Sequence, residues 1–269
     1  AMEVYAQEEW YYNNNNKSVR NKHISAKYKE DLALLSKYVN NDTIYDFIRN
    51  WGVTLNGRRF TLGSNINVHE GVFVTLLLKN SIKPSTKVFN VVEVGFAFGT
   101  SSMYINNALN VLEDRANVKH TIIDPNQDKQ WGFVGLYNVY RMKKPFIETE
   151  WIKDFSDKAF NIIKKYRKTK YDIAFVDGGH SYDIVMQDCK DVDVILKKGG
   201  LVIHDDVLHS DITKVIKEYY VGNKSYEKVK IEIKINKDGK ETSKIVVDKE
   251  GCFPANIDKT KSFTNSKTM

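Results

Sequence analysis

The chain has 269 residues, of which 42% are hydrophobic and 28% charged, so it can bury a full core, while no apolar run approaches the roughly 18 to 20 residues of a membrane span. It has only two cysteines, Cys189 and Cys252, and no recognisable signal peptide, so we expect no disulfide framework and a reducing, cytoplasmic compartment. The net charge of +7 comes from lysines that alternate with apolar residues, as on solvated faces, and this pattern disfavours a nucleic-acid partner.

The first 80 residues are predicted to lie outside the main folded core. Residues 1–24 combine an asparagine run with a small aromatic cluster, which predicts a flexible arm and leaves homo-oligomerisation open. Apolar residues then recur at helical spacing from Ser25 to Trp51, which predicts two short helices, and a further helix is expected from His69 to Lys79. Residues 25–80 are therefore expected to form a helical cap.

Short β-rich runs alternate with helical stretches through the rest of the chain, which predicts a parallel sheet with helices on both faces. Strands are expected at Val88–Gly95, Val118–Asp124, Pro145–Trp151, Tyr171–Asp177 and Gly200–Asp205. The runs VVEVG, DIAFVD and GLVIHD are almost continuously apolar, as strands buried on both faces should be.

The pattern changes after a helix that is expected from Asp211 to Tyr220. The segments KVKIEIKI and TSKIVVD alternate polar and apolar residues around the turn signal Asp238-Gly239, which predicts an antiparallel hairpin. We predict an α/β, Rossmann-like core over residues 81–253, with seven strands in one sheet and a terminal hairpin, and a flexible tail over residues 254–269.

Residues that could carry chemistry stand where the predicted strands end, because ligands of open α/β sheets bind beyond the carboxyl ends of the strands. The first strand ends in EVGFAFGTSS, in which Gly95, Ala97 and Gly99 allow a tight turn and close approach to a ligand. Asp124 follows the second strand and could hold the two ribose hydroxyls of a nucleoside. A turn that binds nothing and a helix cap are the alternatives.

The fourth and fifth predicted strands end in three carboxylates. Asp177 precedes two glycines and His180, and the fifth strand ends in the adjacent Asp205 and Asp206. Neighbouring carboxylates repel unless a cation lies between them, and hard oxygen ligands suit Mg²⁺, Mn²⁺ or Ca²⁺. The alternative is a capping or salt-bridge role.

Together, EVGFAFG, the strand-end Asp124, FVDGGHSYD and LKKGGLVIHDD resemble the class I S-adenosylmethionine (SAM) dependent methyltransferases over residues 65–220. Within that class the chain is most similar to the metal-dependent small-molecule and sugar O-methyltransferases (methyltransferase family 24, with catechol-type, macrolide-sugar and cephamycin-pathway relatives). The resemblance implies methyl transfer to a hydroxyl of a small molecule or carbohydrate, with SAM and Mg²⁺ or Mn²⁺ as cofactors.

The resemblance also implies roles for individual residues. The implied cofactor contacts are Glu93, Gly95, Ala97, Gly99, Thr100, Ser101, Asp124, Asp154 and Asp177. Asp177, Asp205 and Asp206 would hold the metal, while His180, as general base, and Asp177 would be catalytic.

Other interpretations stay open. A SAM-fold protein that only binds, an RNA-directed methyltransferase and an NAD-dependent oxidoreductase are rivals, although GFAFG lacks the third glycine of the dinucleotide fingerprint. Several side chains could belong either to the site or to ordinary core and surface: Trp131, Tyr137, His204, His209, Arg58 and Arg59.

Overall fold

The computed structural model describes residues 33–34, 37–39, 66, 68–221, 223–236 and 238–248. The predicted arm, most of the predicted helical cap and the predicted tail lie outside these residues. Within the described part of the chain, no helix is long and apolar enough to cross a membrane.

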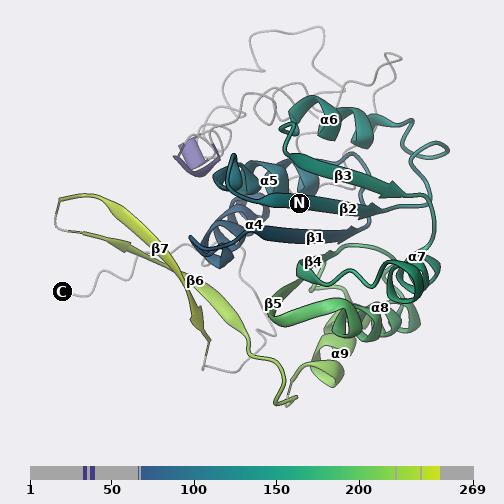
Figure 1. The fold of residues 1–269 in the computed structure, drawn as a ribbon. Helices are drawn as coiled ribbons and strands as arrows, with labels where there is room; N and C mark the ends of the chain where they lie inside the picture. Colours follow the sequence, from purple (N-terminus) through teal and green to yellow (C-terminus); the bar gives the residue numbers. More distant parts are fainter. Residues whose placement is uncertain are drawn as a thin grey trace, which may run out of the picture.

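Five parallel strands form the central sheet, in the order β3-β2-β1-β4-β5 (Figure 1). Their bounds are Val88–Val94 for β1, Asn117–Ile123 for β2, Ile147–Ile152 for β3, Tyr171–Val176 for β4 and Leu196–His204 for β5. All five predicted strands are confirmed, with β5 beginning four residues earlier than expected. The chain passes outward from β1 to β3 and then returns to β4, so the order reverses between the neighbouring strands β1 and β4.

Helices cover both faces of this sheet. They are α4 (Val68–Ser81), α5 (Thr100–Leu109), the 3₁₀ turn η1 (Asn110–Leu112), α6 (Val134–Met142), α7 (Ser156–Ile162), the π turn η2 (Ile163–Arg167), α8 (Tyr182–Ile195) and α9 (Ser210–Tyr219). The predicted helices near α4 and α9 are thus confirmed within one or two residues.

Strand β1 shows how the two faces divide, because successive side chains of a strand point in opposite directions. Phe89 and Val91 pack with residues of α4 and α5, whereas Val92 and Val94 pack with α7 and α8. Each of these four side chains is at most 3% exposed. The central strand is therefore buried on both faces, as its apolar run predicted.

The terminal hairpin is confirmed, but the prediction of one seven-stranded sheet is wrong. Strands β6 (Val229–Ile235) and β7 (Glu241–Val247) pair antiparallel with each other as a separate two-stranded sheet. Figure 1 shows this sheet projecting away from the central one. Its inner side chains Ile231 and Ile233 join the cluster that contains α4, while alternate lysines stay exposed. Strands that are apolar on one face only suit this position rather than the interior of a doubly covered sheet.

Candidate active site

The loop after β1 lies at the carboxyl end of the sheet, where β1 and β4 end side by side. Gly95 has φ +79°, and a Cβ added there would lie 1.7 Å from the carbonyl oxygen of Asp177. Gly99 has φ +76°, and its Cβ would lie 2.8 Å from the carbonyl oxygen of Gly135. Ala97 also has a positive φ, of 42°. Both glycines are therefore required by close backbone approach as well as by the left-handed conformation, and the tight turn that the sequence predicted is present.

Glu93 lies beneath this loop and is fully buried. Its carboxylate accepts hydrogen bonds from the hydroxyls of Ser101 and Ser102 and from Nε2 of His120, the last at 2.9 Å. Thr100 and Ser101 occupy the first turn of α5 and are each 5% exposed. A buried carboxylate is costly unless donors surround it, so Glu93 is held firmly at the base of the loop.

Asp124 lies at the end of β2 and is 3% exposed. Its Oδ2 accepts hydrogen bonds from the amides of Phe96 and Ala97, both at 3.1 Å, and its Oδ1 accepts one from the amide of Asn126 at 2.7 Å. The carboxylate therefore links the end of β2 to the glycine-rich loop, and its role toward a ribose stays a prediction.

The segment between β2 and α6 covers the glycine-rich loop. Gln127 is fully buried and donates from Nε2 to the carbonyl oxygen of Ala97 at 2.7 Å. The ring of Trp131 packs edge-to-face on Phe98 with centroids 5.0 Å apart, whereas the side chain of Tyr137 is 45% exposed. Trp131 thus contacts the loop, and Tyr137 faces outward.

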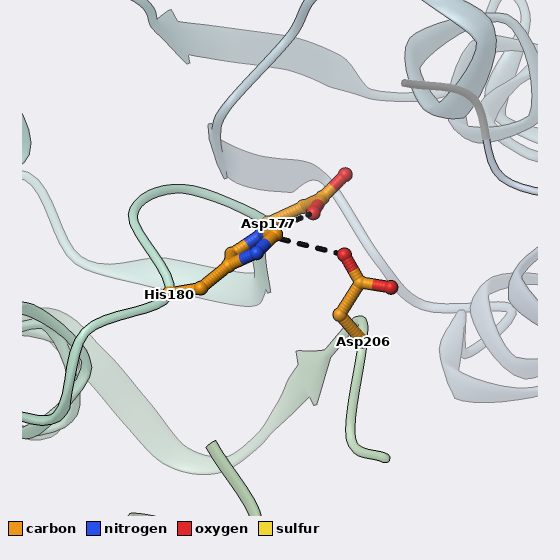
Figure 2. Close-up of side chains that lie close together, drawn as sticks. All are labelled: Asp177, His180 and Asp206. Carbon is orange, nitrogen blue, oxygen red and sulfur yellow. Dashed lines mark ion pairs between the residues drawn. The ribbon is translucent and has the colours of Figure 1, made fainter. Parts of the chain in front are cut away.

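A second set of side chains gathers where β4 and β5 end (Figure 2). His180 points between two carboxylates, with its Nε2 3.3 Å from Oδ2 of Asp206 and 3.9 Å from Oδ1 of Asp177. One ligand atom from each of these three residues lies within 4.8 Å of the others, which is close enough for a shared metal ion. Asp205 stands outside this group of three, but it lines a small cavity of about 10 Å³ together with Asp177 and His180.

Burial and like charge perturb these groups. Burial, followed by the charge of Asp206, raises the pKa of Asp177 to about 6, although the ion pair with His180 opposes this. Burial raises the pKa of Asp205 to about 7, and the charges of Asp177 and Glu70 add to the effect. The ion pair with Asp177 is the main cause of the raised pKa of His180, which the charge of Asp206 also favours. The carboxylates of the cluster thus outnumber the positive charges near them.

The remaining sequence candidates are more scattered. Asp154 follows β3, where its Oδ1 accepts a hydrogen bond from the amide of Phe155 at 2.9 Å. His209 precedes α9, and its ring centroid is 5.5 Å from that of His180. His204 lies against Cys189 and Tyr220, and burial lowers its pKa to about 4. Arg58 and Arg59 lie outside the described residues.

Four polar residues around this edge were missed by the sequence interpretation. They are Glu70, His120, Gln127 and Asp188. The last three are at most 1% exposed. The available signal was a polar side chain within a segment that is otherwise predicted to be buried, which requires a partner.

Comparison with known proteins finds a matching domain family and similar folds. Residues 92–207 match the family model described as a methyltransferase domain. In structure the chain is similar to the O-methyltransferase from Bacillus cereus in complex with SAH, with a TM-score of 0.55 and 11% identity over 81% of this chain and 95% of that chain. It is also similar to CalS11, a TDP-rhamnose 3′-O-methyltransferase of calicheamicin biosynthesis, with a TM-score of 0.45 and 11% identity over 84% of this chain and 96% of that one. No curated protein matches the chain by sequence.

The family match begins within β1 and ends just after β5, so it spans the strand ends described above. Residues 92–207 thus match a methyltransferase domain, as the sequence motifs predicted, and the fold resembles that of the Bacillus cereus O-methyltransferase.

Proposed function

We propose that this protein transfers a methyl group from SAM to a hydroxyl oxygen of a small molecule, sugar or glycan, and that a divalent cation assists. The observation that carries this proposal is the meeting of Asp177, His180 and Asp206 at the strand ends beside the glycine-rich loop. A hydroxyl is a poor nucleophile unless a base removes its proton and positive charge stabilises the resulting oxyanion.

The residues fit a hard divalent cation. Carboxylate oxygens are the ligands that Mg²⁺ and Mn²⁺ prefer. Burial, with neighbouring negative charge, raises the pKa values of Asp177 and Asp205, and a nearby cation would lower the cost of ionising them. Asp177 and Asp206 would hold the ion, and Asp205 would complete the set from the adjoining cavity. The cation would supply positive charge beside the developing oxyanion, and SAM would supply the methyl group from its sulfonium centre.

The chain's own residues then divide two tasks. Glu93 and Asp124, buried at the loop, would fix the two ends of the cofactor, because each carboxylate is held by several donors. His180, with a 41% exposed side chain, can meet an acceptor and take its proton on the imidazole ring as the new oxygen–carbon bond forms and the carbon–sulfur bond breaks. The products are the methyl ether and S-adenosylhomocysteine.

The acceptor class is inferred from the chemistry of the site. The cluster is acidic apart from its histidines, so an anionic acceptor would be repelled unless the cation were bound. A neutral sugar or other polyhydroxylated acceptor can approach without that penalty, and this also disfavours RNA.

The deciding experiment compares Asp177→Asn with Asp183→Asn, an exposed aspartate in the first turn of α8. We expect S-adenosylhomocysteine, measured by calorimetry, to bind both variants within about threefold of the parent protein. Methyl transfer to a panel of sugars and phenols, with Mg²⁺ supplied, should fall at least about 100-fold for Asp177→Asn only. Activity of Asp177→Asn that persists with a chelator would overturn the metal-assisted mechanism. Cofactor binding without transfer to any hydroxyl would favour a protein that only binds.

A further inference from the structure

His120 occupies the middle of β2 and is fully buried, although its neighbours on the same face of that strand, Val118 and Ile122, are apolar. In the parallel ladder His120 is opposite Val91 and Ile122 is opposite Glu93, so the side chains of His120 and Glu93 point to the same face of the sheet. That face is covered by α5, which supplies Ser101 and Ser102 to the same carboxylate.

The hydrogen bonds define which ring nitrogen carries the donated proton. Nε2 of His120 lies 2.9 Å from Oε2 of Glu93, and a carboxylate only accepts. Nδ1 lies 3.4 Å from the amide nitrogen of Asn106, which can only donate. His120 therefore donates from Nε2 and accepts at Nδ1, while Asn106 also donates to the carbonyl oxygen of Ser102 at 2.8 Å. The chain of contacts runs from the middle of β2 to the first turn of α5.

Packing alone does not explain this arrangement. An apolar side chain in β2 would avoid the cost of burying an imidazole, an amide and a carboxylate together. All of these groups are at most 1% exposed. What the imidazole adds is a fixed donor that holds one oxygen of Glu93, while the two serine hydroxyls hold the carboxylate from the α5 side. The orientation of Glu93 toward the loop is thus determined from two elements at once.

We infer that His120 is a positioning residue, which holds the Glu93 carboxylate in the orientation that binds the amino group of the cofactor's methionine moiety. The inference rests on the proposed role of Glu93 in cofactor binding. His120 itself would touch neither the cofactor nor the acceptor.

The test uses two amides of different reach. The side-chain nitrogen of glutamine can occupy the place of Nε2, whereas that of asparagine reaches only the place of Nδ1. His120→Gln should therefore keep the affinity for S-adenosylhomocysteine within about threefold, and His120→Asn should weaken it about tenfold or more. Affinity for 5′-methylthioadenosine, which lacks the amino acid part, should change less than about twofold in both variants. Thr121→Val, at the next and equally buried position, is the control and should leave both affinities unchanged.

Three outcomes separate the possible failures. Equal weakening of both ligands by His120→Asn, or equal effects of the two amides, would make His120 a packing residue and overturn the inference. If Glu93→Gln binds S-adenosylhomocysteine like the parent protein, the proposed role of Glu93 fails first. If His120→Asn does not fold, NMR of the unmodified protein decides: the Nε2 proton of His120 should shift when S-adenosylhomocysteine binds and stay in place with 5′-methylthioadenosine. A signal that does not respond to S-adenosylhomocysteine would overturn the inference.

Discussion

Asp188 on α8 gives a prediction about stability that is independent of the catalytic proposal. Its side chain is 1% exposed, and neither carboxylate oxygen has a hydrogen-bond partner among the described residues. Burial raises its pKa to about 7, the nearby hydroxyl of Ser156 opposes this shift, and the charges of Asp191 and Asp157 add to it. Asp188 is therefore held in an environment that favours its protonated form.

The sign of the effect follows from comparing the folded and unfolded chains. In the unfolded chain an aspartate loses its proton near pH 4, whereas Asp188 in the folded protein keeps its proton until about pH 7. Between these values the folded state binds the extra proton, so Asp188's contribution to the free energy of unfolding falls as pH rises. The folded and unfolded pKa values of Asp188 differ by about 3, and each pH unit corresponds to about 1.4 kcal/mol. The protonated side chain therefore contributes at most about 4 kcal/mol to the free energy of unfolding, and this contribution is lost above pH 7.

Asp188→Asn should remove this penalty. Denaturant unfolding at intervals from pH 4.5 to 8.5 should show the variant gaining stability over the parent protein as pH rises, by about 1 to 4 kcal/mol at the alkaline end. The control is Asp191→Asn, one helical turn further on, because Asp191 is buried but paired with Lys164 at 2.5 Å. That variant should lose stability at neutral pH. A constant difference between Asp188→Asn and the parent protein across the pH range would refute the reasoning.

Two further predictions concern the site. Gly95→Ala should abolish binding of S-adenosylhomocysteine in calorimetry, since its Cβ would collide with the carbonyl oxygen of Asp177. The control Gly199→Ala, with nearly the same φ but open space around the added Cβ, should cost only about 1 kcal/mol of stability. Normal binding by Gly95→Ala would contradict the loop structure. Asp206→Asn removes a proposed metal ligand, so activity should fall; it also removes a charge that raises the pKa of His180, so the acidic limb of the remaining pH profile of kcat/KM should move to lower pH. A limb that stays in place or moves upward would argue against His180 as the base.

The parallel sheet could be predicted from the sequence because each strand carries its own signal. VVEVG, DIAFVD and GLVIHD are apolar on both faces, and the chain has little choice but to bury them. The pairing of the hairpin could not be predicted in the same way. Its alternating residues specify antiparallel strands with one buried face, but whether that face meets β5 or α4 depends on side chains such as Asn80, which hydrogen-bonds Ser243 at 2.9 Å. Such contacts join residues far apart in the sequence.

The positions of the candidate site residues were predictable to a similar degree. Because parallel strands end at one edge, Asp177 and Asp206 were expected to meet, and they do so through His180. The finer geometry was not: Asp205 and Asp206 are neighbours in sequence, yet only Asp206, which adopts a φ of 49°, joins the group of three. Backbone conformation at a single residue thus separates two adjacent carboxylates, and residue type carries no signal for it.

Buried polar residues show most clearly where such reasoning stops. Three such residues interrupt apolar or helical patterns: His120, Gln127 and Asp188. In a prediction from pattern alone, each interruption only weakens the signal for a helix or strand. Their meaning depends on what the fold brings opposite: a carboxylate and an amide for His120, a loop carbonyl for Gln127, and no hydrogen-bond partner among the described residues for Asp188. The first two side chains hydrogen-bond groups at or near the glycine-rich loop, although Oε1 of Gln127 has no partner among the described residues, whereas both carboxylate oxygens of Asp188 lack one. The role of a polar residue in a predicted core segment can therefore be assigned only when its partners in the folded structure are known.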